Sequence, residues 1–139
     1  MLRMTLLHPE ILQALGASGH GSKVLIADGN YPFDTGSHPG ARRVYLNFAP
    51  GKLTVTEILA VLITVIPIET AEVMMPDSGR EAPIFLEFRS LLPGLELKAL
   101  ERLAFYDQAR SPKVCLVIAT GEQRTYGNLL LTIGVVTPD

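Results

Sequence analysis

Two polar clusters flank a short apolar segment, residues 23–27, and both carry side chains able to move protons or bind hydroxyl groups. His20 precedes the segment between two glycines, and Asp28 and Asn30 follow it. Histidine titrates near neutral pH, which suits general acid–base catalysis. A straight five-residue strand spans about 17 Å, so His20 and Asp28 cannot meet across it. Each can line a pocket if the chain turns at Gly21 or if subunits assemble; taken singly, both are ordinary turn residues.

Two further polar clusters lie later in the chain, at residues 101–110 and 120–128. Taken singly, the first is an amphipathic helical turn with exposed arginines and the second is a solvated hairpin loop. Together with His20 and Asp28 they offer tyrosine, asparagine and arginine side chains. This combination suits a polyhydroxylated ligand such as a sugar, which needs many paired donors and acceptors and an aromatic wall.

The sequence does not predict a metal ion or a cofactor. The three histidines, His8, His20 and His38, are far apart, and none forms a ligand pair with helical or hairpin spacing. The glycine-rich segment 16–21 follows a predicted helix and precedes a strand, which is the wrong order for a dinucleotide or phosphate loop.

Composition excludes several classes of partner. The net charge of −2 and the pI near 5.9 leave no basic footprint for nucleic acid. The longest apolar stretch, residues 58–68, is too short to span a bilayer, and the single cysteine, Cys115, cannot form an internal disulfide. We therefore expect a cytoplasmic protein that does not contact a membrane. The mean hydropathy of +0.28 indicates either a large core or apolar surface buried between subunits, and we favour the second.

The elements that must position these side chains alternate between strand and helix. Hydrophobic periodicity and turn residues predict helices over 9–17, 55–66, 82–92 and 105–110, and strands over 23–27, 43–48, 71–75, 113–119 and 128–133. Thr54 and Glu57 have the spacing of a capping box before the second helix, although its β-branched residues leave a strand as the alternative. The alternation predicts one α/β domain over residues 1–139, with a central, largely parallel sheet flanked by helices.

Three motifs resemble the ribose pyranase and fucose mutarotase family (the RbsD/FucU group). They read GHGSKVLIADGNYP at 19–32, RLAFYDQAR at 102–110 and ATGEQRTYGNLLLTIGVV at 119–136. The resemblance extends from about His8 to Val136. Arg102, before the AFY segment, is similar to the fucose mutarotase branch, whereas the ribose branch typically has a histidine there.

The resemblance implies a cytoplasmic isomerase that interconverts the anomers of L-fucose or a related monosaccharide without a metal or cofactor. It implies that His20 is the proton donor, that Tyr106 assists proton transfer, and that the remaining site residues bind the sugar: Asp28, Arg102, Tyr126, Gly127, Asn128, Glu69 and Met74. It also implies a homo-oligomer, a decamer in bacterial members, whose YGN segment completes a site in the neighbouring subunit. The alternatives are D-ribose pyranase activity and a non-catalytic sugar-binding accessory protein.

Overall fold

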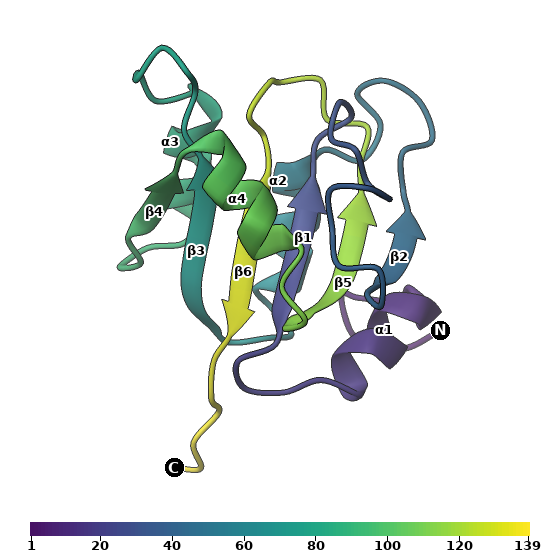
Figure 1. Ribbon diagram of the computed structural model, residues 1–139. Helices are drawn as coiled ribbons and strands as arrows, with labels where there is room; N and C mark the ends of the chain where they lie inside the picture. Colours follow the sequence, from purple (N-terminus) through teal and green to yellow (C-terminus); the bar gives the residue numbers. More distant parts are fainter.

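The six strands form one sheet in the order β2-β5-β1-β6-β3-β4 (Figure 1) in a computed structural model that describes residues 1–139. β6 is antiparallel to both of its neighbours, β1 and β3, and the other three pairings are parallel. The predicted α/β class with a largely parallel sheet is confirmed. The strands are β1 Lys23–Ala27, β2 Arg42–Tyr45, β3 Ile68–Met74, β4 Leu97–Leu100, β5 Val114–Ala119 and β6 Leu129–Ile133.

Four helices of eight residues each connect or precede the strands: α1 Pro9–Gly16, α2 Val55–Leu62, α3 Ile84–Leu91 and α4 Arg102–Ala109. The predicted capping box is present at α2, where the Thr54 hydroxyl accepts from the Glu57 N–H and the Glu57 carboxylate accepts from the Thr54 N–H. The strand alternative for this segment is therefore wrong. The helix ends at Leu62, four residues earlier than predicted.

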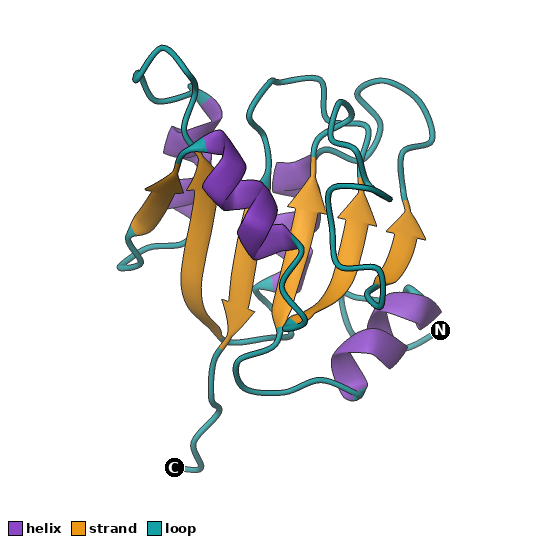
Figure 2. Cartoon of the chain, in the orientation of Figure 1, coloured by secondary structure: helices purple, strands orange, loops and turns teal.

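Helices cover both faces of the sheet (Figure 2). α1, α2 and α3 pack on one face in a core of 23 buried residues, which includes Ile11, Leu59 and Phe88. α4 and the loop after β1 pack on the other face in a smaller core of ten, centred on Phe105 and Val117. β1 and β6 are apolar on both faces because both faces are covered, as the sequence pattern predicts for central strands.

Most of the polar clusters lie at one edge of the sheet, the one formed by the carboxyl ends of its parallel strands. Asp28 follows β1, Thr120 follows β5, and Met74 ends β3, so all three lie where parallel strands end. β6 runs the opposite way, and therefore Asn128, which precedes it, reaches the same edge. Open α/β sheets commonly bind ligands at this edge. His20 lies at the opposite edge, before β1.

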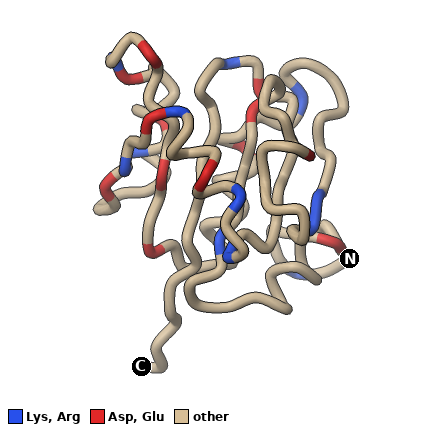
Figure 3. Tube along the Cα trace, in the orientation of Figure 1, with Lys and Arg blue, Asp and Glu red and all other residues tan.

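The charged residues do not segregate by sign. Figure 3 shows lysine and arginine interspersed with aspartate and glutamate along the chain, without a continuous basic face. No helix is both long enough and apolar enough to cross a bilayer.

Candidate functional site

Six of the predicted side chains line one small pocket at the carboxyl edge of the sheet. The pocket has a volume of about 230 Å³, and nine residues line it: Asp28, Asn30, Tyr31, Met74, Arg102, Tyr106, Thr125, Tyr126 and Asn128. These residues come from the loop after β1, the end of β3, the first half and middle of α4, and the loop before β6. The predicted contact Met74 is among them. The sheet topology, rather than sequence proximity, brings them together.

Asp28 is the buried acid of this pocket, with 3% of its surface exposed. Its Oδ1 accepts the Asn30 N–H at 2.9 Å and its Oδ2 accepts the Gly127 N–H at 3.1 Å. Burial raises the pKa of the Asp28 carboxyl, although these backbone N–H groups act in the opposite direction and nearby Glu122 adds to the rise. A carboxyl with a raised pKa, held by two fixed donors, is suited to accept a hydroxyl or its proton.

The YGN segment reaches the pocket through an unusual backbone conformation. Tyr126 has a φ of 60°, in the left-handed region that costs a non-glycine residue about 1–3 kcal/mol. The bend presents the Tyr126 side chain to the pocket and turns the Gly127 N–H toward Asp28. Asn128 closes the arrangement, because its Oδ1 accepts the Asp28 N–H at 2.8 Å. Asp28 and the YGN segment therefore form one hydrogen-bonded unit within a single chain.

An ion pair between buried Glu122 and the 40% exposed Arg124 anchors the loop that carries this segment. Glu122 is 3% exposed, and its two carboxylate oxygens accept the Arg124 guanidinium at 2.9 Å each and the Val55 N–H at 3.2 Å. Arg124 also pairs with the exposed Glu87 of α3. Burial alone would raise the pKa of Glu122, but the hydrogen bonds and charge of Arg124 outweigh it and the pKa is lowered. Residues 123–125 of this loop are exposed, but its two ends, 120–122 and 127–128, are buried, and hydrogen bonds tie it to α2 and α3 rather than leaving it a free solvated loop.

Two tyrosines form the aromatic wall of the pocket. The rings of Tyr31 and Tyr106 lie 5.4 Å apart, and the Arg110 guanidinium carbon lies 5.5 Å from the centre of the Tyr106 ring. Tyr31 is fixed by a hydrogen bond from its hydroxyl to the Gly36 carbonyl at 2.6 Å. Arg102, at the first position of α4, is exposed and has no hydrogen-bond partner within the chain. Its guanidinium is free to bind a ligand in the pocket.

Three predicted residues do not line the pocket of this chain: Gly127, which contacts Asp28 through its backbone N–H, and the more distant His20 and Glu69. The latter two pair with each other, His20 Nε2 to Glu69 Oε1 at 3.0 Å, and both side chains are about half exposed. Both lie at the edge of the sheet opposite Asp28, because β1 and β3 begin there. The expectation that a straight strand separates His20 from Asp28 is confirmed.

The YGN segment lies beside Asp28 of its own chain. Tyr126 and Asn128 line the pocket that Asp28 and Arg102 of the same chain also line, because the antiparallel β6 returns this segment to the edge where β1 ends. The role that the resemblance implies for the segment in a neighbouring subunit's site stays a prediction.

The pocket also includes three residues outside the predicted set: Asn30, Tyr31 and Thr125. Asn30 and Tyr31 lie within the GHGSKVLIADGNYP motif, so the signal was present, but the glycine- and proline-rich context favoured a loop without a role. Thr125 carries no motif signal of its own. No group of three histidine, cysteine or acidic side chains is placed to hold a metal ion.

Comparison with known proteins agrees with this geometry. Residues 1–136 match the model of the RbsD / FucU transport protein family. The fucose mutarotase of Bos taurus is 34% identical over 96% of this chain and 92% of its own length, and the D-ribose pyranase of Variovorax paradoxus is 30% identical over 97% and 98%. The crystal structure of FucU from Bifidobacterium longum superposes with a TM-score of 0.79 at 34% identity, covering 94% of this chain and 95% of that one. The chain belongs to the RbsD/FucU family.

Proposed function

We propose that this protein is a monosaccharide mutarotase that interconverts the anomers of L-fucose or a closely related sugar. The observation that carries the proposal is the pocket that gathers Asp28, Arg102, Tyr106, Tyr126 and Asn128 from separate segments. It combines a buried carboxylate, a free guanidinium, an amide and two phenols, which together match the hydroxyls and the apolar face of a sugar ring. Relatives named as fucose mutarotases support the reaction class.

The reaction needs only proton transfers. The bond between the anomeric carbon and the ring oxygen breaks as the ring oxygen gains a proton and the anomeric hydroxyl loses one. The open aldehyde then turns and the ring closes on its other face, with the protons returned. No electrons are transferred, so acid–base groups suffice, and such groups typically contribute about 10²–10⁴-fold in rate.

Each group has a distinct role in this proposal. Burial raises the pKa of the Asp28 carboxyl. Asp28 binds the sugar hydroxyls next to the anomeric centre and forms hydrogen bonds in which their protons are shared. Arg102 offers a fork of donors to sugar oxygens, and Asn128, Gly127 and the Tyr126 backbone fix the orientation of Asp28. Tyr106 lines the pocket and relays a proton between the sugar and its partner base.

We further propose that His20, the proton donor, reaches the pocket from a neighbouring subunit of a homo-oligomer, a decamer by family resemblance. Two features support this arrangement. The His20–Glu69 pair is exposed at the opposite edge of the sheet, available for contact with another chain. The pocket, at about 230 Å³, is below the range of about 300–1,000 Å³ usual for ligand sites, as expected when a wall is missing. Glu69 then orients the imidazole, as a carboxylate does for many catalytic histidines.

L-fucose is preferred over D-ribose because Arg102 occupies the position that the resemblance assigns to the fucose branch, and both kinds of relative match this chain. A non-catalytic sugar-binding role remains the competing function, since the pocket alone accounts for binding. We place the protein in the cytoplasm, where its unpaired Cys115 suits a reducing environment, as one domain over residues 1–139.

Saturation transfer between the anomeric protons, measured by NMR, tests the proposal. L-fucose and D-ribose are offered separately to the wild type, to His20→Ala and to His38→Ala, a matched histidine outside the pocket. We expect fast anomer exchange with the wild type and with His38→Ala, and little or none with His20→Ala. This result would support a mutarotase in which His20 takes part in the proton transfer. Binding of a sugar without faster exchange in the wild type would establish the accessory role instead.

A further inference from the structure

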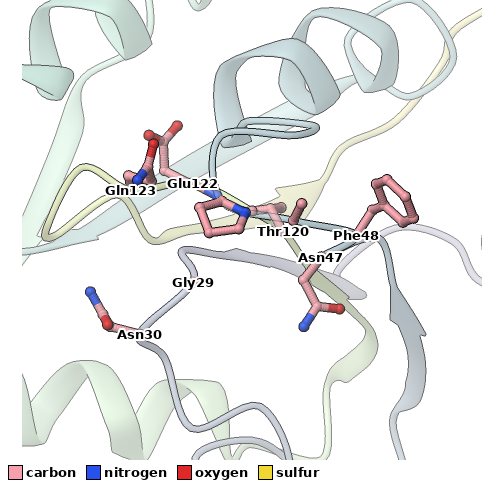
Figure 4. Close-up of a pocket in the computed structure, with 10 residues that line it drawn as sticks. Gly29, Asn30, Asn47, Phe48, Thr120, Glu122 and Gln123 are labelled. Atoms are coloured by element: carbon pink, nitrogen blue, oxygen red, sulfur yellow. The ribbon is translucent and has the colours of Figure 1, made fainter.

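A second, larger cavity adjoins the pocket at the same edge of the sheet. Figure 4 shows it above the turn at Gly29, between the loop after β2 and the loop after β5. Its volume of about 480 Å³ lies within the usual range for small-molecule sites. Asn30 lines both cavities, so the two are neighbours that share a wall. The cavity is lined by Gly29, Asn30, Asn47, Phe48, Ala49, Pro50, Thr120, Gly121, Glu122 and Gln123.

The lining has the chemistry of a binding site for hydroxyl groups. Asn30, Asn47 and Gln123 contribute three exposed side-chain amides, and none has a hydrogen-bond partner within the chain. Each amide offers both a donor and an acceptor, which is the pairing that a hydroxyl group needs. Phe48, 88% exposed at the rim, adds an aromatic surface for the apolar face of a ring.

The cavity carries no free charge. Glu122 is its only ionisable lining residue, and that carboxylate is turned to Arg124 and to the Val55 N–H. No lysine or arginine lines the cavity, so it offers no cationic side chain to a phosphate group. Its ligand should therefore be neutral.

We propose that this cavity is a second sugar subsite, which binds the non-reducing residue of a neutral reducing disaccharide whose reducing residue occupies the pocket at Asp28. The proposal rests on the proposed mutarotase function and extends its substrate class beyond monosaccharides. Mutarotation requires only a free anomeric hydroxyl, and a disaccharide keeps one on its reducing residue. Asn30, on the shared wall, lies beside the linkage between the two rings.

The test compares L-fucose with a disaccharide whose reducing residue is L-fucose, using anomeric saturation transfer on the wild type and on the double variant Asn47→Leu/Gln123→Leu. Gln13→Leu, a change of the same chemistry on α1 away from both cavities, is the control. We expect a lower KM for the disaccharide than for the monosaccharide. Loss of two amides should raise the disaccharide KM about tenfold relative to the monosaccharide KM.

Equal KM values for the two sugars, or an equal effect of the double variant on both, would overturn the proposal. A change of oligomer size in the double variant, seen by size-exclusion chromatography, would also overturn it, because the cavity would then be a contact between copies. If the wild type exchanges neither sugar, the mutarotase function fails and saturation-transfer difference NMR decides the subsite separately. Signals from both rings of the disaccharide would support the subsite, and signals from one ring or none would refute it.

Discussion

Glu122 provides a test of how the site loop is held in place. In Glu122→Gln the side chain keeps its size but loses its charge, and one oxygen becomes an NH₂ group. That group faces the Arg124 guanidinium or the Val55 N–H, both of which are donors. The substitution therefore removes the ion pair and sets donor against donor at a position that is 3% exposed.

The expected loss of stability follows from this burial. Breaking a fully buried pair costs about 3–5 kcal/mol, but Arg124 is 40% exposed and keeps Glu87 as a partner, so we expect a loss of about 1–3 kcal/mol. For a chain of this size, each kcal/mol lowers Tm by about 3–4 °C. We therefore expect Tm to fall by roughly 3–12 °C at pH 7, measured by circular dichroism at a fixed protomer concentration, since assembly itself shifts Tm.

The pH dependence gives an independent readout. The pKa of Glu122 in the folded chain is lower than its ordinary value of 4.5, because the hydrogen bonds and charge of Arg124 outweigh burial, which acts upward. A carboxyl of this kind stabilises the fold above its unfolded pKa, and the contribution is lost as pH falls through the folded value. The difference in free energy of unfolding between the wild type and Glu122→Gln should be full at pH 7 and shrink below pH 4.5.

Glu87→Gln is the matched control, because Glu87 binds the same Arg124 but is 54% exposed. An exposed pair contributes about 0–1 kcal/mol, so Tm should change by only a few degrees. Equal losses of Tm in the two variants, or a difference that persists unchanged at pH 3, would refute the claim that the buried carboxylate anchors the loop.

Three further changes separate binding, positioning and packing. Arg102→Ala should leave the free energy of unfolding within about 0.5 kcal/mol of wild type, because Arg102 has no hydrogen-bond partner in the chain. It should nevertheless raise KM in the NMR exchange assay, and Arg102→Lys should restore only part of the lost affinity. Gly127→Ala places a Cβ 3.0 Å from the Arg124 carbonyl oxygen and 3.1 Å from Glu122 Cγ, so the shifted N–H should release Asp28 and slow anomer exchange by about 10²-fold. Phe105→Ala should lower the free energy of unfolding by about 3–5 kcal/mol in urea titrations, because the side chain is fully buried, whereas Leu103→Ala on the same helix, 63% exposed, should change it little.

Most of the fold follows from patterns that the sequence displays. The strands at 23–27, 113–119 and 128–133 are recognisable because covering both faces of a sheet requires uninterrupted apolar residues. β4, at Leu97–Leu100, was missed because it is an edge strand of four residues with only Leu97 buried, so no alternation is visible. α4 begins three residues earlier than predicted, since its cap is Glu101, a residue type that does not mark helix starts in sequence.

The candidate site, like the fold, could be predicted from the sequence only in part. The motif residues Asp28 and Tyr126 were predicted, and both line the pocket. The anchoring role of Glu122 could not be predicted, because TGEQR has the composition of a solvated loop, and only its partners on α2 and α3 explain its burial. Nor does the sequence show which edge of the sheet each segment reaches. The antiparallel direction of β6, visible only in the fold, places Asn128 at the edge where Asp28 lies and leaves His20 at the opposite one.

The proposed division of the site between two chains makes a prediction about mixed oligomers. His20→Ala and Asp28→Asn should each be inactive alone, but in co-assembled mixtures some pockets join an intact Asp28 to an intact His20 from a different chain. Random mixing in equal amounts restores about a quarter of the sites in a symmetric oligomer. Asp28→Asn mixed with Tyr126→Phe is the control, and it should restore none, because Asp28 and Tyr126 share one pocket of one chain. Recovery in the control equal to that in the first mixture, or no recovery in either, would show that His20 does not act across a subunit boundary.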